Sequence, residues 1–287
     1  MAAVRTRLEG GYHNDVFRVS DGSRTLVEKH YAAPYGPNPM YPNLPEQEAL
    51  ALRVMAESGR APRFVDFVPA TPTTRAVLRY EFVHGSGWSR GVVDVARLLH
   101  DVHRVPVDRR LRRLLRTPGD VLAHADSMVD DVPRRLSAPL RAVRPDLDAA
   151  SSRSLPAGES VVHTDCGPGN VIRGGRHGLV LIDWQCPGRG DPVEDLACFR
   201  SPAMMILYGK RPLSPPTARR FLATYAGLSV DGAASVERLA DVGAAWHFRI
   251  GAYCVWRAHE LRRRAPEVAA RYLRALAAEI DHLEGLR

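Results

Sequence analysis

The chain has 287 residues, of which 45% are hydrophobic, so it can bury a substantial core in one or two domains. Its formal net charge is +8, but the arginines are spread along the chain, which favours a solvated basic surface over a nucleic-acid interface. Without an apolar signal segment, a run of about 18 apolar residues or C-x-x-C spacing, we expect a cytoplasmic protein with reduced thiols and neither membrane spans nor zinc.

The first predicted elements are short strands joined by glycine turns. Residues 7–19 are predicted to form a hairpin whose turn contains Gly10, Gly11 and Asn14, and a second turn leads to a strand over 25–29. A glycine turn lets backbone N–H groups approach phosphate oxygens closely. Taken alone, the stretch favours an ordinary hairpin over a nucleotide loop.

Lys29, at the end of the second hairpin, is unusual for its residue type. Of the 40 Lys and Arg residues, only Lys29 and Lys210 are lysines. An ammonium is a compact point charge, which suits a narrow site between phosphates and a carboxylate better than a guanidinium does. The lysine at 29 therefore indicates a site that needs an ammonium group.

Residues 30–45 hold five prolines and cannot form a helix or a central strand. Because this connection is longer than usual, we expect a lid or a substrate-facing element. A helix is predicted over 46–58, and strands over 64–68 and 76–83 would complete a five-stranded antiparallel sheet. A hinge is predicted at His84-Gly85-Ser86-Gly87.

Beyond the hinge the pattern becomes helical. The clearest periodicity of 3.6 residues covers 92–103, and later helices are predicted over 215–226, 233–264 and 266–286. Residues 108–150 are rich in arginine, are interrupted by prolines and carry no usable motif.

The helix predicted over 233–264 carries aromatic residues near helical spacing. Trp246, Tyr253 and Trp256 precede Glu260, and aromatic rings with an acid can form a cage for an ammonium group. Packing of these rings in the core is the favoured interpretation.

The most informative stretch holds a polar loop and a short apolar strand. The loop carries His163, Asp165 and Asn170, and the strand that follows ends in Asp183. Chance predicts only about 0.01 matches to His-x-Asp-x4-Asn in a chain of this composition. A proton-accepting acid, an amide oxygen and a carboxylate at a strand end are the groups that phosphoryl transfer needs. The sequence therefore predicts a kinase.

This stretch resembles the catalytic core of the aminoglycoside phosphotransferase and choline kinase-like family. The family pattern is roughly H-G-D-x-x-x-x-N, then I-D-W, then G-D-P-x-x-D-L-A, and residues 190–197 match the last element in full. The chain has Thr164 where the family usually has glycine, and Gln185 where an acidic residue often follows the tryptophan. These departures bear on the substrate class more than on activity.

The resemblance implies roles for the matched residues. Asp165 would be the base that orients the substrate hydroxyl, and Asn170 and Asp183 would hold Mg²⁺. His163 and Asp191 would support the catalytic loop.

The resemblance also implies a nucleotide site. Lys29 would pair with a helix glutamate, for which Glu48 is favoured over Glu46 because the helix pattern matches in that register. At the hinge, the backbone of Glu81 and Val83 would bind adenine. The residues implied to form this site are Gly10, Gly11, Asn14, Lys29, Glu48, Glu81 and Val83.

We therefore expect an α+β, two-lobed, protein-kinase-like fold, with an antiparallel sheet plus helix over 1–84 and a mainly helical lobe over 85–287. The expected reaction is transfer of the γ-phosphoryl group of ATP, with Mg²⁺, to a hydroxyl of a small cationic molecule. The resemblance implies acceptors that range from aminoglycosides to the alternative of choline, ethanolamine or thiamine-type alcohols.

Two other functions are less favoured. Only seven residues separate Asp183 from Asp191, which leaves no room for the activation segment of a protein kinase. A non-catalytic nucleotide-binding module would be expected to have lost the base, a metal ligand or the lysine, and all of these are present.

Overall fold

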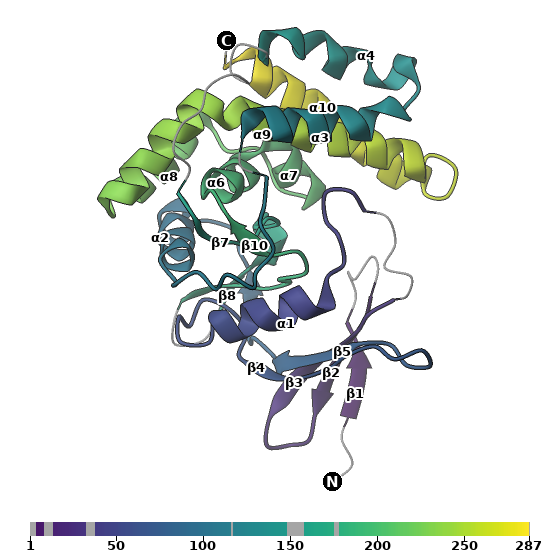
Figure 1. The fold of residues 1–287 in the computed structure, drawn as a ribbon, viewed down its shortest axis with the longest axis vertical. Coiled ribbons are helices and arrows are strands. Elements are labelled where there is room, and N and C mark those ends of the chain that lie inside the picture. Colours follow the sequence, from purple (N-terminus) through teal and green to yellow (C-terminus); the bar gives the residue numbers. More distant parts are fainter. Residues whose placement is uncertain are drawn as a thin grey trace.

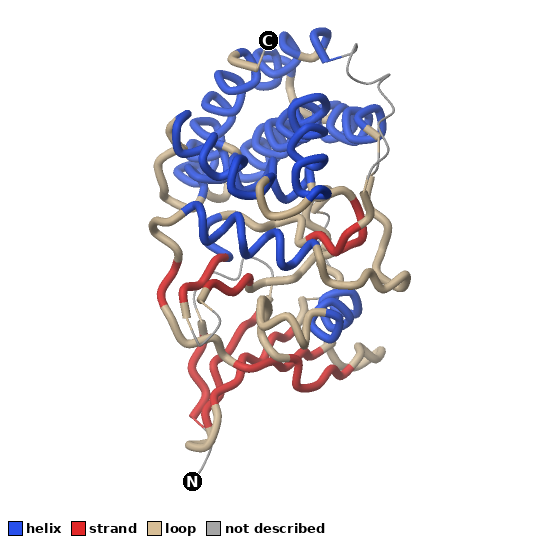
Figure 2. The backbone as a smooth tube through the Cα atoms, turned by 90° about the vertical axis from the view of Figure 1, so that its left-hand side faces the viewer, coloured by secondary structure: helices blue, strands red, loops and turns tan. Residues whose placement is uncertain are grey.

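The computed structural model describes residues 4–8, 14–32, 38–115, 117–147, 158–174 and 178–286. An antiparallel sheet forms one end of the molecule and helices form the other (Figures 1 and 2). This arrangement is the predicted α+β, kinase-like one. The predicted division of the chain at residue 84 stays a prediction.

The N-terminal sheet has the strand order β1-β2-β3-β5-β4. Its strands are Val4–Arg7 (β1), Asp15–Ser20 (β2), Thr25–His30 (β3), Phe64–Val68 (β4) and Val77–Glu81 (β5). On the central strand β3, Lys29 lies opposite Val16 of β2 and Leu78 of β5. Side chains alternate between the faces of a strand, so Lys29 shares its buried face with Val27.

Helix α1 (Pro45–Val54) contacts β4 and β5 and ends four residues before the predicted end. Residues 55–58 form turns up to Gly59, whose φ of 65° favours glycine. The first strand was predicted too late in the chain, because β1 ends at Arg7.

The C-terminal part is built around α9, a helix of 32 residues that contacts α3, α6, α8 and α10. Apolar side chains cover several of its sides, and Ser229 caps its first turn by accepting a hydrogen bond from Gly232. The helices are Val92–His103 (α2), Pro118–Asp130 (α3), Arg134–Val143 (α4), Val193–Arg200 (α6), Pro202–Leu207 (α7), Pro215–Ala226 (α8), Val230–Leu261 (α9) and Pro266–Glu284 (α10), with 3-10 turns at Pro145–Leu147 (η1) and Pro168–Asn170 (η2).

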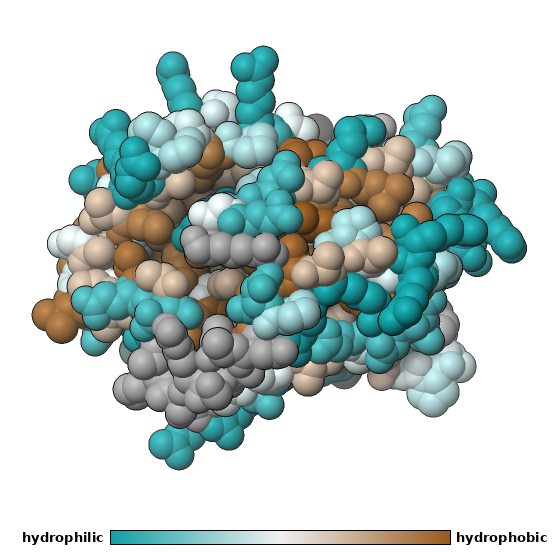
Figure 3. All heavy atoms as spheres, turned by 90° about the horizontal axis from the view of Figure 1, so that it is seen from above, coloured by the Kyte–Doolittle hydropathy of each residue, from teal (hydrophilic) through white to brown (hydrophobic). Residues whose placement is uncertain are grey.

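The outer face of this helical part carries many hydrophilic side chains, with hydrophobic residues visible between them (Figure 3). Within the described ranges, no helix combines the length and the apolar character that a bilayer crossing needs.

Short strands lie between the two parts. They are Ser86–Gly87 (β6), Ser160–Val162 (β7), Val171–Arg173 (β8), Leu179–Leu181 (β9) and Gly188–Gly190 (β10). The polar loop over 163–170 follows β7, and Asp183 follows β9. Strand β8 pairs with both β6 and β9, and β7 pairs with β10. The predicted hinge therefore includes a strand. A Cβ at Gly85 would lie 2.2 Å from the carbonyl oxygen of Arg173, so only glycine fits this crossing.

Candidate active site

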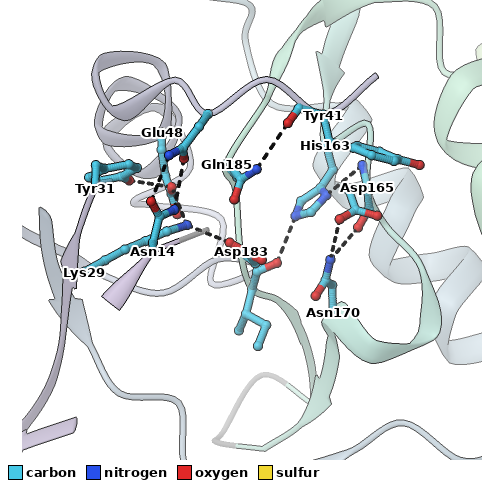
Figure 4. A network of polar contacts seen from close by, with 12 residues as sticks. Asn14, Lys29, Tyr31, Tyr41, Glu48, His163, Asp165, Asn170, Asp183 and Gln185 are labelled. Atoms are coloured by element: carbon cyan, nitrogen blue, oxygen red, sulfur yellow. Dashed lines mark hydrogen bonds and ion pairs between the residues drawn. The ribbon is translucent and has the colours of Figure 1, made fainter. Parts of the chain in front are cut away.

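The loop that follows β7 is tied to the end of β9 by His163. Its buried ring donates from Nε2 to the carbonyl oxygen of Ile182 at 3.0 Å, while Nδ1 lies 3.3 Å from the backbone nitrogen of Asp165 (Figure 4). Burial lowers the pKa of His163. A neutral ring that donates at one nitrogen and accepts at the other matches these contacts, and it fixes the loop relative to Asp183.

Two non-glycine residues of this region adopt left-handed backbone conformations, Thr164 with φ 71° and Asp183 with φ 59°. Such a conformation favours glycine, the residue that the family pattern has in place of Thr164. The Thr164 hydroxyl compensates by donating to the carbonyl oxygen of Cys186 at 3.0 Å. Strain at both positions is consistent with a functional loop.

Asp195 accepts hydrogen bonds from the backbone of the loop. Its carboxylate lies 2.9 Å from the nitrogen of His163 and 2.8 Å from that of Thr164. The sequence predicted that Asp191 would support the loop. Its two carboxylate oxygens instead form an ion pair with Arg238, each at 2.9 Å, and Oδ1 also accepts a hydrogen bond from the backbone nitrogen of Val193. The direct contacts with the loop thus come from Asp195, which lies one helical turn after Asp191. Sequence reasoning missed Asp195 although it lies in the same D-P-x-x-D motif.

Asp165 and Asn170 face each other across the loop. Asn170 donates from Nδ2 to the backbone oxygen of Asp165 at 2.7 Å and to its carboxylate at 3.2 Å, so its amide oxygen is directed elsewhere. Burial and the charge of Asp183 raise the pKa of Asp165 to about 8, against the hydrogen bonds from Asn170 and Tyr208. This is the range in which a carboxylate can exchange a proton near neutral pH.

Tyr208, just after α7, completes this cluster. Its hydroxyl lies 3.5 Å from Asp165 Oδ1 and 3.3 Å from Asn170 Nδ2. A Cβ at Gly167 or Gly169 would lie 2.4 Å or 2.1 Å from the Tyr208 ring, so these glycines let the ring pack on the loop. No sequence motif signals Tyr208, because the contact depends on how α7 packs.

A second cluster joins the sheet to the strand end that carries Asp183. Lys29 Nζ lies 2.8 Å from Glu48 Oε2 and 2.7 Å from Asp183 Oδ1 (Figure 4). The side chains of Lys29 and Glu48 are 3% and 1% exposed, whereas that of Asp183 is 45% exposed. The helix contact is thus made by Glu48 and not by Glu46, which is exposed.

Two carboxylates therefore share one ammonium group. Burial alone would lower the pKa of Lys29, but the charges of Asp183 and Glu48 outweigh it and the net pKa is raised. Burial raises the pKa of Glu48, which also accepts a hydrogen bond of 2.5 Å from the Tyr31 hydroxyl. The partial burial of Asp183 opposes ionisation, yet Lys29 keeps the pKa of Asp183 below its usual range.

We expect Lys29→Arg to lower kcat/KM by about tenfold or more, equivalent to ~1.4 kcal/mol. The buried space between Glu48 and Asp183 is filled by a point charge, and a guanidinium is wider and spreads its charge over a plane. The measurement is steady-state kinetics, with the unliganded melting temperature compared in parallel.

Lys210→Arg is the matched control, because Lys210 is the chain's other lysine and is absent from the residues that line the cavity. It should have wild-type kinetics. Wild-type kinetics in Lys29→Arg as well would mean that any cation serves at this position.

The predicted nucleotide residues have different surroundings. Asn14 is buried and exchanges two amide hydrogen bonds with Asn43, of 2.9 and 2.8 Å, so it anchors the segment before α1. Val83 lines the cavity, whereas the exposed side chain of Glu81 pairs with Arg63 at 3.5 Å. The prediction for Gly10 and Gly11 lies outside the described residues.

A single cavity of about 530 Å³ connects these clusters. One end is apolar and formed by the sheet and the hinge, with Val16, Val27, Tyr80, Phe82 and Val83. The polar middle is lined by Lys29, Asp165, Asn170, Asp183 and Gln185, and the far end by Asn38, Tyr41, Met204, Leu207, Tyr208, Tyr253, Arg257, Val268, Arg271 and Tyr272.

The described part of the proline-rich segment borders this cavity. Asn38 donates to the Tyr253 hydroxyl at 3.1 Å, and Gln185 donates to the backbone oxygen of Tyr41 at 3.3 Å. The segment over 38–44 therefore faces the far end of the cavity, and Gln185, at the second departure from the family pattern, holds it there.

The donor set of the middle section suits Mg²⁺. Asp183 offers a half-exposed carboxylate and Asn170 an amide oxygen, and oxygen donors of this kind are what Mg²⁺ prefers. Among the described residues there is no group of three or more His, Cys, Asp or Glu side chains that could hold a metal by themselves. A metal here would thus share its coordination with phosphates and water, as is usual for Mg²⁺.

The fold and the grouping of residues define a kinase-like phosphotransferase. The chain belongs to the phosphotransferase enzyme family, whose model matches residues 4–239. No curated protein matches the chain by sequence. The predictions of the family, of the fold and of a small-molecule kinase are thereby confirmed.

Solved structures of similar fold include kinases of small molecules. A choline kinase from Streptococcus pneumoniae is 15% identical, with 98% of this chain and 95% of that chain covered and a TM-score of 0.65. A spectinomycin phosphotransferase in complex with ADP and spectinomycin is 13% identical, with coverage of 100% and 93% and a TM-score of 0.67. A Plasmodium vivax ethanolamine kinase is 13% identical, with coverage of 96% and 82% and a TM-score of 0.67. At these identities the similarity shows the fold.

Proposed function

We propose that this protein transfers the γ-phosphoryl group of ATP to a hydroxyl group of a small molecule in a Mg²⁺-dependent reaction. The observation that carries the proposal is one cavity lined by Lys29, Asp183, Asn170 and Asp165, a cation and three oxygen-bearing groups with distinct surroundings. The apolar end bounded by the sheet and hinge would take the adenine, as the complexes of related folds with ADP suggest.

Lys29 and Asp183 would separate when nucleotide binds. Lys29 Nζ is bonded to both Glu48 and Asp183, so contact with the phosphates would replace the Asp183 bond while Glu48 keeps the ammonium in place. This change frees Asp183 to hold Mg²⁺ together with the amide oxygen of Asn170. The bound metal would neutralise the charge that develops on the phosphates.

Asp165 would accept the proton of the acceptor hydroxyl. Asn170 donates to Oδ2 of this carboxylate at 3.2 Å, whereas the Tyr208 hydroxyl donates to Oδ1 at the longer distance of 3.5 Å. Oδ1, the more weakly bonded oxygen, is therefore the one we assign to the proton. Positioning of the hydroxyl and of the phosphates supplies most of the rate acceleration in reactions of this class.

ADP formation from Mg-ATP with a panel of amino alcohols, aminoglycosides and vitamins tests the proposal, with EDTA as the control. We expect acceptor-dependent ADP formation that EDTA abolishes. Failure to bind Mg-ATP, or equal turnover in EDTA, would reject it.

A cytoplasmic location is proposed from the need for ATP and from the four cysteines, which are all unpaired.

A further inference from the structure

The far end of the cavity has an aromatic wall that begins beside the catalytic loop. The Tyr41 and Tyr253 rings pack edge to face with their centroids 5.0 Å apart. The Tyr253 and Tyr272 rings do the same, with their centroids 6.0 Å apart. Tyr208 joins this wall to Asp165. Aromatic walls of this kind favour a flat or cyclic ligand, since ring faces and edges pack well on one another.

Of the described residues that line this end of the cavity, two arginines are the charged ones. Arg257 lies one helical turn after Tyr253 on α9, and Arg271 precedes Tyr272 on α10. Both arginines line the same cavity as the two tyrosines. In the part of the chain that the structure describes, neither has an ion-pair partner. The turn between α9 and α10 lies on the same side of the molecule as the segment over 38–44 (Figure 1).

Among the described residues, no carboxylate that could hold a cation lines this end of the cavity. Among the described residues that line the cavity, the carboxylates are Asp165 and Asp183, and both belong to the phosphoryl-transfer site. Glu260, the acid of the possible ammonium cage, is exposed and does not line the cavity, while Trp246 is 2% exposed in the core. The aromatic residues of α9 therefore form no cage with that acid.

The charge at this end disfavours a cationic ligand. Two guanidinium groups, that of the half-buried Arg257 and that of the exposed Arg271, border this apolar-walled end of the cavity. They repel an ammonium and attract an anion, and the low-polarity wall weakens the screening by water. Guanidinium groups also bind carboxylates and phosphates through two parallel hydrogen bonds and stack on rings. At the nearby turn the exposed Arg262, Arg263 and Arg264 outnumber the exposed Glu260 and Glu267, so the charge there is positive as well.

We propose that the phosphate acceptor is a ring-containing hydroxyl compound with an anionic group, which Arg257 and Arg271 bind while the ring lies against the tyrosines. This inference rests on the proposed function, and it departs from the cationic acceptor that the family resemblance implies. A new bond would form between the acceptor oxygen and the γ-phosphorus, the bond from that phosphorus to ADP would break, and the hydroxyl proton would pass to Asp165.

Three compounds with one skeleton and different charges test the proposal: para-hydroxymethylbenzoate, para-hydroxymethylbenzamide and para-hydroxymethylbenzylamine. We expect kcat/KM to be at least about tenfold higher for the benzoate than for the benzylamine, which is ~1.4 kcal/mol. If none is turned over, the dissociation constants of the three compounds, measured by calorimetry, should follow the same order. Equal values, a preference for the benzylamine, or no binding of any of them would overturn the proposal.

Charge reversal identifies the groups responsible. Arg257→Glu and Arg271→Glu should each raise KM for the benzoate, or its dissociation constant, by about tenfold or more and leave KM for ATP unchanged. Arg274→Glu is the matched control, because Arg274 is another exposed arginine of α10 that does not line the cavity. A rise in KM for ATP in place of the acceptor would show that the arginines bind nucleotide, which also overturns the proposal.

Binding of Mg-ATP separates this inference from the proposed function. If the protein binds Mg-ATP and phosphorylates the benzylamine best, the acceptor proposal fails and the proposed function stands. If it binds no Mg-ATP, the proposed function fails, whatever the three compounds do.

Discussion

Asp165→Asn should lower kcat by about two to four orders of magnitude and leave the affinity for Mg-ATP nearly unchanged. The carboxylate lies between Asn170 and Tyr208, away from Lys29, so it meets the acceptor and not the nucleotide. The substitution keeps the shape of the side chain and removes its ability to take a proton. Single-turnover kinetics with saturating ATP and a separate measurement of the dissociation constant of Mg-ATP would check both parts.

The same variant should be more stable than the wild type in metal-free buffer at pH 8. Burial and the charge of Asp183 raise the pKa of Asp165 to about 8, so the folded protein favours the protonated acid. The stability that this group contributes is complete below its unfolded pKa of ~3.9 and is lost as the pH rises towards about 8. The asparagine does not titrate, and it avoids this loss.

Melting temperatures of both proteins between pH 4 and pH 8, with EDTA, give the measurement. The advantage of Asp165→Asn should grow with pH over this interval. A melting-temperature difference that stays constant with pH would show that the carboxylate has an ordinary pKa, and equal losses of nucleotide affinity and of turnover would contradict its placement on the acceptor side.

The parts of the fold that local patterns specify could be predicted from the sequence. Helix α2 has the predicted bounds because its apolar residues recur at helical spacing, and α8 begins where Ser214 can cap a turn that starts with prolines. The five-stranded sheet follows from alternation and turns. Helix α1 ends early because helical periodicity does not mark where a helix unwinds into turns: Met55 stays buried although the helix ends at Val54.

Some residues of the candidate site could be predicted from a local sequence pattern, and others could not. His163, Asp165, Asn170 and Asp183 lie in one short stretch, so their spacing alone makes them stand out. Tyr208 reaches Asp165 across 43 residues of sequence, through the packing of α7 on the loop.

The two arginines at the far end of the cavity depend even more on tertiary packing. Arg257 and Arg271 line one cavity only because α9 and α10 pack against each other beside the segment over 38–44. In the sequence they cannot be distinguished from the chain's many other arginines. The proposed acceptor site thus lies where sequence patterns carry least information, whereas the residues proposed for the reaction lie in a loop with a recognisable pattern.

Asp183→Ala should abolish the Mg²⁺-dependent part of ATP binding, with the dissociation constant of Mg-ATP raised by about a hundredfold or more, or ~2.7 kcal/mol. Asp183 is a half-exposed carboxylate whose pKa Lys29 holds low, so it brings a full negative charge to the metal. Asn170 brings only an amide oxygen, and Asn170→Ala should leave weaker activity that depends more steeply on the Mg²⁺ concentration.

The comparison that decides between metal binding and general damage is ATP binding with and without Mg²⁺. In EDTA, the wild type and Asp183→Ala should bind ATP about equally, because Lys29 keeps its buried partner Glu48 at 2.8 Å and stays available to the phosphates. Asp183→Asn, which keeps an oxygen donor but loses the charge, should fall between the alanine variant and the wild type in Mg²⁺. Identical dissociation constants for the wild type and Asp183→Ala in Mg²⁺ would remove Asp183 from the metal site, and a loss in EDTA of the same size as in Mg²⁺ would show that the substitution damages the nucleotide site itself.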